Sequence, residues 1–555
     1  MSSFLSLDSN IFSIWAVRGL SIVLFGILYA VYTREATVLR KVPGPFLASI
    51  TKLWVVAKQR SFKRPLVDME LHRIYGPIVR VAPNEVMVSS PKAFRTIYGA
   101  GSHFAKGEWY IGASDCGWSG PDSLDFLSEK NMEKYRHQRR AIGPAYSEKY
   151  MRDIEANLDN MIAKNIDIMH QRAGQSQDLD TFLNMFASGQ LLPSFSSSLL
   201  ALTLPDCLST ATFSEAKNLV ELGRPDEVIH SIHRAWKYMH VAGYFPTCHR
   251  LGKWCTHGTG LAWLTRIIQL LSPLMEGRPR VKNVSSLPHE HAFAFTVNHI
   301  RERLARRDDN STLTDERPTD IAAKLIQLQV EKGQLSDSWI VGCCLQNYAA
   351  GSETIAITIS ALINATVTHG CQKRIHQEID SARRAGMLSR PPKLREMKDR
   401  LPYLSACLSE SQRLHPVVGM PLVRTVPEGG CELEGMFLPA GTTVGINPWV
   451  LARDKSLYGE DAEIWRPERW LEYSQEKLKS LETYNATFGT GARSCPGKHL
   501  AQAIYTKAIP MLFSDFEWSF TDPDAEKVLQ CTFSTRFVKL MMEWKVRDKA
   551  TTETR

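Results

Sequence analysis

A long apolar stretch with almost no charge lies near the start of the chain, from Ile11 to Tyr32, and Arg18 is its single charged residue. At about 1.5 Å per residue, a helix of this length crosses the ~30 Å hydrocarbon core of a bilayer. Arg34, Arg40 and Lys41 follow, and the positive-inside rule then puts the rest of the chain in the cytosol. A cleaved signal peptide would need basic residues before the stretch, and none is present. The pattern therefore predicts an uncleaved membrane anchor.

Two prolines around a glycine, in the segment Lys41–Pro45, follow the apolar stretch and cannot belong to a continuous helix. We expect a hinge here, so that residues 1–42 form the anchor and hinge and residues 43–555 form one large body. Within that body, Pro77–Val88 alternates like two short strands around a turn at Pro83–Asn84.

Helical periodicity dominates the rest of the body. The longest helix is expected at 336–369, with Gly370 as its stop, and it is apolar on most faces, which predicts burial. Further helices are expected at 402–415 and, at the end of the body, about 498–513. The intervening segment 429–445 is rich in turn residues with short β patterns. The predicted fold class is mainly α with small β-sheets (α+β).

The stretch 181–205 carries no charge and is rich in serine and leucine. Pro193 and a group of serines interrupt its apolar run, which argues against a second membrane span. A buried loop or an inserted segment fits this composition better. For residues 189–205 a genuine insertion and an error in the translated gene both stay open.

The composition is that of an ordinary globular protein, with 44% hydrophobic and 23% charged residues among 555, which excludes a disordered chain and a collagen-like repeat. The 11 cysteines are scattered without a CxxC pair, so neither a disulfide framework nor a zinc site is indicated. His289, His291 and His299 are interpreted as surface residues rather than as a metal cluster. The net charge of +9 is spread along the chain and leaves the class of partner open.

The segment Phe488–Gly497 (FGTGARSCPG) is the strongest chemical signal in the sequence. It is not a dinucleotide-binding fingerprint, because Ser494 stands where that pattern needs its third glycine. Gly491 and Gly497 allow the backbone to approach a flat ligand, and Arg493 can bind a carboxylate. Cys495 lies just before a predicted helix, a setting that favours a thiolate.

These residues resemble the FxxGxRxCxG haem loop of the cytochrome P-450 family without exception. The resemblance implies the cytochrome P-450 fold with an N-terminal transmembrane helix, covering residues 43–555 as the haem domain. It also implies that Cys495 is the axial thiolate of the iron of haem b, whose electron donation favours O–O bond cleavage. The other matching positions that would surround the haem are Phe488, Gly491 and Arg493.

The segment Ala350–Thr354 (AGSET), inside the long buried helix, resembles the oxygen-activation motif of the family. A buried acid next to a hydroxyl is unfavourable unless it has a purpose. We expect Gly351 to leave room for dioxygen, and Thr354 and Glu353 to transfer protons as the catalytic pair. A helix that merely carries a polar pair is the alternative.

Glu410 and Arg413 stand three residues apart, where their charges can meet on one helix face. This ExxR pattern resembles the family's K helix, and Arg469 would complete a buried structural network.

The resemblance also assigns arginines to the haem propionates, namely Arg424, Arg493 and Arg139. The assignment of Arg139 rests on a weaker match, because Tyr135 stands where the family pattern has Trp or His.

The resemblance implies a monooxygenase that inserts one oxygen atom of O2 into an apolar small molecule. Residues 419–430 and 445–454 look like the fungal pisatin-demethylase-like branch, which favours a role in secondary-metabolite biosynthesis. The alternatives are a detoxifying or catabolic monooxygenase, an O2-independent haem-thiolate isomerase or dehydratase, and a haem sensor. The residues that line the substrate pocket are not decided by the sequence. An aromatic-rich stretch with Trp109 and Trp118 either lines the pocket or packs in the core.

Too few residues follow Cys495 for a flavin or nicotinamide domain, so the resemblance implies NADPH electrons from a separate cytochrome P-450 reductase, with cytochrome b5 as a further candidate donor. The expected location is the endoplasmic reticulum membrane, with a single span and a cytosolic catalytic domain. The expected partners are therefore a reductase, membrane lipid and an apolar substrate, and not nucleic acid.

Overall fold

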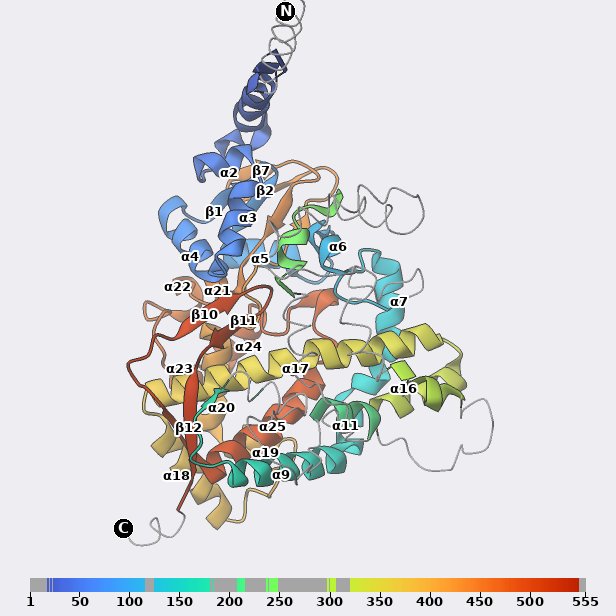
Figure 1. The fold of residues 1–555 in the computed structure, drawn as a ribbon, viewed down its shortest axis with the longest axis vertical. Helices are drawn as coiled ribbons and strands as arrows, with labels where there is room; N and C mark the ends of the chain where they lie inside the picture. The colour runs from blue at the N-terminus through green and yellow to red at the C-terminus, as the bar shows by residue number, and fades with distance from the viewer. Residues whose placement is uncertain are drawn as a thin grey trace, which may run out of the picture.

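The structure is a computed structural model and describes most of the body (Figure 1). The described residues are 17–18, 20–21, 23–114, 124–179, 183, 207–214, 236–237, 239–247, 297–298, 300–305 and 320–548. Several predicted features lie wholly or largely outside them: residues 11–16, the stretch 181–205, Trp118, and the histidines His289, His291 and His299.

The helices are concentrated on both sides of the longest one, α17. The N-terminal part contains η1 (Tyr32–Ala36), η2 (Val38–Lys41), α2 (Phe46–Ile50), α3 (Leu53–Arg60), α4 (Arg64–Tyr75) and α5 (Pro91–Tyr98). The next part contains α6 (Trp109–Ser114), α7 (Met132–Ile142), η3 (Gly143–Tyr146), α8 (Glu148–Asp153), α9 (Glu155–Gln171) and α11 (Cys207–Phe213). The C-terminal part contains α16 (Ile321–Lys332), α17 (Asp337–Thr368), α18 (Gln372–Arg384), α19 (Glu396–Arg400), α20 (Pro402–Leu414), α21 (Pro448–Leu451), α22 (Lys455–Tyr458), α23 (Arg469–Glu472), α24 (Gln475–Glu482), η4 (Gly491–Arg493) and α25 (Lys498–Asp515).

The long helix α17 crosses the body from one side to the other, as Figure 1 shows. Its N-cap is Ser336, whose side chain accepts a hydrogen bond from the Trp339 N–H, and Gly370 follows its end with φ +66°. The prediction for 336–369 is confirmed. Among the described residues α17 is the one helix long and apolar enough to cross a membrane, but 78% of its apolar window is buried inside the protein. It is therefore a core helix, packed against α11, α16, α20 and α25.

The other sequence predictions for regular elements hold with small changes. The expected helix at 402–415 is α20, which begins at Pro402 and has His415 as its C-cap. The last helix, α25, continues two residues beyond the expected end, to Asp515. Its buried side chains join those of α17 in the largest core cluster.

Small sheets flank this helical core. The five-stranded sheet has the order β1 (Ile78–Ala82), β2 (Glu85–Val88), β8 (Thr443–Gly445), β5 (Arg424–Thr425) and β3 (Ala105–Lys106). The three-stranded sheet has the order β4 (Gln177–Asp178), β12 (Met541–Val546) and β9 (Phe516–Phe520). The hairpins are β6 (Cys431–Leu433) with β7 (Met436–Leu438), and β10 (Val528–Cys531) with β11 (Thr535–Val538).

The register of the five-stranded sheet places functional candidates together. The predicted hairpin around Pro83–Asn84 is confirmed, since β1 and β2 are antiparallel with Ile78 opposite Val88. At the other edge, β3 pairs with β5 so that Lys106 lies directly opposite Arg424. Two buried cations from distant parts of the sequence are thereby fixed side by side.

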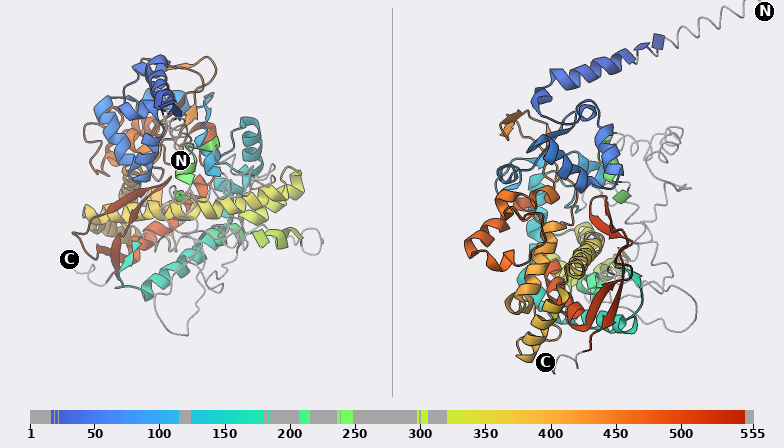
Figure 2. Two further views of the ribbon diagram at one scale, coloured as in Figure 1. Left: turned by 45° about the horizontal axis from the view of Figure 1, so that its top comes forward. Right: turned by 90° about the vertical axis from the view of Figure 1, so that its left-hand side faces the viewer.

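An N-terminal helix extends away from the body, as the right-hand view of Figure 2 shows. Residues 23–31 are helical, and large apolar side chains on them are exposed, including Phe25, Leu28 and Val31. The chain then returns to the body, where the Arg80 guanidinium donates to the Thr33 carbonyl at 2.7 Å.

Candidate active site

The segment Phe488–Gly497 forms a closed loop ahead of α25. The Cys495 N–H donates to the Phe488 carbonyl at 2.7 Å. Gly491 has φ +61°, and a Cβ at this position would lie 2.7 Å from the Tyr98 carbonyl oxygen. Both the backbone conformation and the close approach therefore require glycine here. The loop holds Cys495 three residues before the first residue of α25.

Cys495 is a free cysteine with an accessible side chain. Burial nevertheless raises the pKa of its thiol, while the Gly497 N–H and the charge of Arg139 act in the opposite direction. The thiol thus keeps accessible surface although neighbouring protein atoms partly desolvate it. Protein surroundings alone favour the neutral thiol, so a stable thiolate needs a further positive charge, such as a metal ion.

Cations from separate segments gather near this sulfur. The Arg493 guanidinium lies over the ring of Tyr135, on α7, at 3.9 Å from its centroid. Burial raises the pKa of the Tyr135 hydroxyl, and the charges that oppose this rise are those of Arg139, Arg493 and Arg424. Burial also lowers the pKa of Lys106 well below its usual range, and the charges of Arg493 and Arg424 lower it further. The structure therefore brings all three predicted arginines together and adds Lys106.

Several donors in this cation cluster lack hydrogen-bond partners within the part of the chain that the structure describes. These donors are the two terminal nitrogens of Arg493 and Nη1 of Arg139, and all of them are buried. The other terminal nitrogen of Arg139 donates to the Ser494 hydroxyl at 3.5 Å. Buried donors without acceptors are unfavourable, and buried guanidinium groups especially so. The arrangement suits an anionic ligand with carboxylate groups.

Thr354 and Glu353 are neighbours on α17 but differ in their surroundings. The half-buried Thr354 hydroxyl donates to the Ala350 carbonyl at 2.8 Å. Glu353 is 5% exposed, and burial raises the pKa of its carboxyl, opposed by Arg536 and the Ser534 hydroxyl. The acid is thus held toward the β10–β11 hairpin.

Gly351 lies where α11 approaches α17 closely. A Cβ at Gly351 would lie 2.8 Å from Cδ1 of Leu208, on α11. That Gly351 leaves room for dioxygen stays a prediction. Its missing side chain allows α11 to pack closely against α17.

Comparison with known proteins agrees with this geometry. The family model described as cytochrome P-450 matches residues 280–543. The chain is 30% identical over 517 residues to the cytochrome P-450 monooxygenase sdnT of Sordaria araneosa, covering 88% of each chain. It is 30% identical over 496 residues to the cytochrome P-450 monooxygenase cicH of Emericella nidulans, covering 88% of this chain and 90% of the relative. The chain belongs to the cytochrome P-450 family.

A third relative, pisatin demethylase of Fusarium vanettenii, is 27% identical over 515 residues, covering 92% of this chain and 91% of the relative. Membership of the cytochrome P-450 family implies a haem held by a cysteine thiolate and identifies the protein as a haem-thiolate monooxygenase. The residues present fit such a group: Cys495 is an accessible thiol, and the nearby cations have buried donors without acceptors among the described residues.

Glu410, Arg413 and Arg469 form one buried network in this cytochrome P-450. Arg413 donates to both carboxylate oxygens of Glu410, at 2.8 and 2.7 Å, and Arg469 donates to it at 3.1 Å. The Trp470 indole adds a hydrogen bond at 2.9 Å. Burial raises the pKa of the Glu410 carboxyl, but the hydrogen bonds and charge of Arg413 outweigh it, and the net pKa is lowered. This network is therefore an ionised cluster with its charges paired.

A link between the thiol side and the oxygen motif was not predicted from the sequence. Tyr505, on α25, is close enough for the charge of Cys495 to affect its pKa. Its hydroxyl donates to Thr358 at 3.0 Å, and the Thr358 hydroxyl donates to the Thr354 carbonyl at 2.9 Å. In the sequence Tyr505 looks like an ordinary core residue. Its contact with Thr358 could not be predicted, because that contact arises from the packing of α25 on α17.

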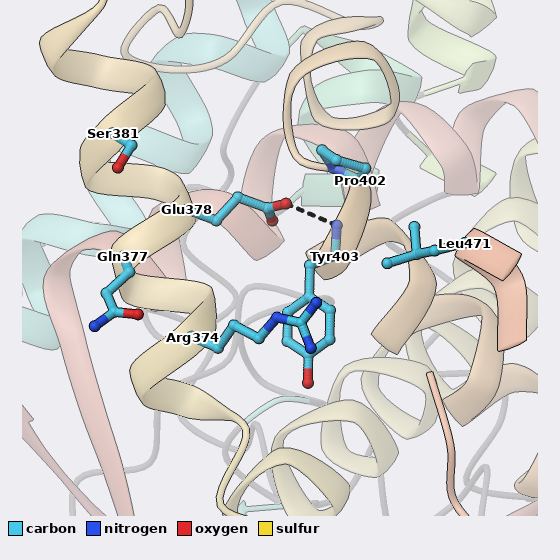
Figure 3. Close-up of a pocket in the computed structure, with 7 residues that line it drawn as sticks. All are labelled: Arg374, Gln377, Glu378, Ser381, Pro402, Tyr403 and Leu471. Carbon is cyan, nitrogen blue, oxygen red and sulfur yellow. Dashed lines mark hydrogen bonds between the residues drawn. The ribbon is translucent and has the colours of Figure 1, made fainter. Parts of the chain in front are cut away.

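The pocket in Figure 3 contains none of the predicted site residues. It has a volume of about 320 Å³ between α18 and α20, and its lining residues are Arg374, Gln377, Glu378, Ser381, Pro402, Tyr403 and Leu471. Glu378 accepts the Tyr403 N–H at 2.7 Å, and the Arg374 guanidinium lies 3.7 Å from the Tyr403 ring centroid. These contacts serve to cap α20 and join it to α18.

Proposed function

We propose that Cys495 would hold the iron of haem b in this monooxygenase, and that Arg139, Arg424 and Arg493, with Lys106, would hold the haem propionates. The accessible thiol and the nearby guanidinium donors that lack partners among the described residues support the assignment. When bound, the haem supplies the activation of O2 and the insertion of one oxygen atom into an apolar substrate. Gly491 and Phe488 shape the loop that presents the sulfur.

We further propose that Thr354 and Glu353 manage the protons of the reaction. The Thr354 hydroxyl is half-buried and can hold a proton at its Oγ1, since its own hydrogen bond goes to a carbonyl one turn back. The pKa of the Glu353 carboxyl is raised and so lies closer to neutral pH, where a group can both accept and release a proton. Glu410, Arg413 and Arg469 have a structural role.

The electron source and location follow from family membership and from the N-terminal region. We propose that electrons come from NADPH through a separate cytochrome P-450 reductase, with cytochrome b5 as a second donor. The exposed apolar helix at 23–31 supports an anchor spanning about 11–32 in the endoplasmic reticulum membrane, with residues 43–555 as a cytosolic haem domain. Deleting residues 1–42 should move the protein from the membrane to the soluble fraction.

The substrate class is an apolar small molecule of secondary metabolism. Pisatin demethylase of Fusarium vanettenii, a fungal relative that this chain matches over most of its length, supports this proposal. Metabolite profiles of the host with and without the gene would identify the compound. An unchanged secondary-metabolite profile, together with loss of growth on a xenobiotic, would favour the catabolic alternative.

Replacement of Cys495 by serine tests the ligand assignment. The wild-type protein should give the long-wavelength reduced-CO Soret band of a thiolate ligand, and Cys495→Ser should lose it because an alcohol is a far weaker ligand. Cys431→Ser, at a partly buried free cysteine on β6, is the matched control and should keep the band. A thiolate band in Cys495→Ser would contradict the proposal.

A further inference from the structure

Two threonines one turn apart on α17 each make a side-chain hydrogen bond to the helix backbone. The Thr354 hydroxyl donates to the Ala350 carbonyl at 2.8 Å, and the Thr358 hydroxyl donates to the Thr354 carbonyl at 2.9 Å. In a regular helix each of these carbonyls already accepts the N–H four residues further on, so each takes a second donor here. Bonds of this kind tend to bend a helix locally. The shape of α17 at the oxygen motif therefore depends on how these hydroxyls are held.

A third hydroxyl, from another helix, extends this series. Tyr505, on α25, donates to the Thr358 hydroxyl at 3.0 Å. Tyr505 is 4% exposed and Thr358 is 2% exposed, and α25 packs against α17 (Figure 1). Burial raises the pKa of the Tyr505 hydroxyl, so this group stays protonated and acts as a donor. The hydrogen bonds thus run in one direction, from Tyr505 through Thr358 to the Thr354 carbonyl.

The Tyr505 hydroxyl favours one side-chain rotamer of Thr358. A threonine inside a helix populates two χ1 rotamers, and its hydroxyl changes place between them. The Tyr505 ring is fixed in the largest core cluster, so its hydroxyl stabilises the rotamer that also reaches the Thr354 carbonyl. Hydrogen bonds in series strengthen one another in a buried setting. Loss of the tyrosine hydroxyl would therefore weaken the bond from Thr358 to the Thr354 carbonyl.

The place of Tyr505 in the chain connects two parts of the candidate site. α25 begins at Lys498, directly after the Cys495 loop, and Tyr505 lies about two turns further on. The series of hydroxyls therefore joins the helix that follows this loop to the helix that carries Thr354. The alternative is a core tyrosine that merely satisfies its own hydroxyl, as Tyr150 does by donating to the Asp320 carbonyl at 2.7 Å.

We propose that Tyr505 is a positioning residue of the oxygen motif, which acts through Thr358 to hold the Thr354 carbonyl and with it the turn that carries the Thr354 hydroxyl. The proposal rests on the proposed role of Thr354 in proton transfer. With Tyr505 in place, Thr354 keeps one position. Electrons from NADPH then go into product and water rather than into hydrogen peroxide.

The first test follows the surroundings of Thr354 by infrared spectroscopy. The C–O stretching band of carbon monoxide bound to the reduced, haem-loaded protein responds to nearby polar groups, so Thr354→Ala should shift the band. Tyr505→Phe keeps the ring and removes only the hydroxyl, and it should shift or split the band because Thr354 then populates more than one position. Thr358→Val should act like Tyr505→Phe. Thr358→Ser, which keeps the hydroxyl, should stay close to the wild type.

The second test measures where NADPH electrons go when the reductase is present. Each O2 that takes up two electrons and two protons and reacts no further leaves as hydrogen peroxide. Tyr505→Phe should raise the ratio of peroxide to the other products of O2 by up to about tenfold, the largest factor that one neutral hydrogen bond supports. Tyr150→Phe also loses a buried tyrosine hydroxyl that donates a hydrogen bond, and as the matched control it should keep the wild-type ratio.

The double variant Thr354→Ala/Tyr505→Phe shows whether Tyr505 acts through Thr354. If it does, the double variant should match Thr354→Ala in both measurements, whereas additive effects would overturn the proposal. A wild-type band in Tyr505→Phe, or equal peroxide ratios in Tyr505→Phe and Tyr150→Phe, would overturn it as well. In that case a change in Thr354→Ala alone leaves the proposed role of Thr354 intact. If Thr354→Ala changes neither measurement, that role fails and this inference fails with it.

Discussion

The two arginine-rich centres of the body differ in how their charges are compensated. In the Glu410 network, Arg413 and Arg469 share the Glu410 carboxylate, and Arg469 also pairs with Asp461 at 3.1 Å. Both guanidinium groups also donate to carbonyls, for example to Ala452 O and Tyr458 O at 2.7 and 2.9 Å. In the cation cluster near Cys495, buried nitrogens of Arg493 and Arg139 have no such partners among the described residues. The first centre has its charges paired, whereas the described residues leave buried donors of the second without an acceptor, which suits an anionic ligand.

The largest expected effect is loss of the shared carboxylate in the Glu410 network. Glu410→Gln removes the carboxylate that compensates Arg413 in the core and leaves Arg469 its pair with the partly exposed Asp461, which should lower the free energy of unfolding by about 3–5 kcal/mol. Chemical denaturation of the haem-loaded protein measures the change. Glu468→Gln, at an exposed pair with Arg374, is the control and should cost less than about 1 kcal/mol. Equal effects of the two substitutions would remove the distinction between the centres.

In the cation cluster near Cys495, loss of one arginine should favour the haem-free protein and weaken haem binding. Arg493→Leu removes a buried cation without acceptors, so the protein without haem should not lose stability and should gain up to about 2 kcal/mol. Haem binding should weaken at least about tenfold, since charge-assisted hydrogen bonds to the carboxylates are lost. Haem titration and denaturation of both forms measure these changes. Destabilisation of the haem-free variant would contradict this interpretation of the centre.

Lys106 provides a pH test of the same centre. Its pKa in the folded protein lies well below the usual value of 10.5. Between the folded-state pKa of Lys106 and 10.5, this side chain is more often protonated in the unfolded chain than in the folded protein. The haem-free protein should therefore become more stable as pH rises toward 10.5. Lys106→Met should flatten that rise. Denaturation midpoints from pH 7 upward check the slope, and identical slopes in both proteins would contradict the prediction.

The smallest effect is expected at Tyr135, the position that departs from the family pattern. Its ring supports the Arg493 guanidinium, so Tyr135→Phe should retain haem affinity. Tyr135→Leu should lose about 0.5–2 kcal/mol of haem binding free energy through the lost cation–π contact. If Tyr135→Phe is as weak as Tyr135→Leu, then the hydroxyl rather than the ring carries the effect.

The sequence could predict those features that are local in the chain. Helix α17 follows from its apolar period and its Ser336 cap, and the Cys495 loop follows from glycine, arginine and cysteine within ten positions. Lys106 and Tyr505 could not be found in this way, because their significance arises from the β3–β5 pairing and from the packing of α25 on α17. The close approach of Leu208, on α11, to Gly351 could not be predicted either, because it arises from the packing of α11 on α17.

The most direct test of the account is an experimental structure of the haem-loaded protein. We expect the Cys495 sulfur on the iron, and propionate oxygens within about 2.7–2.9 Å of the Arg493 and Arg139 nitrogens that otherwise lack acceptors. Iron bound to another side chain, or propionates directed away from these arginines, would contradict it.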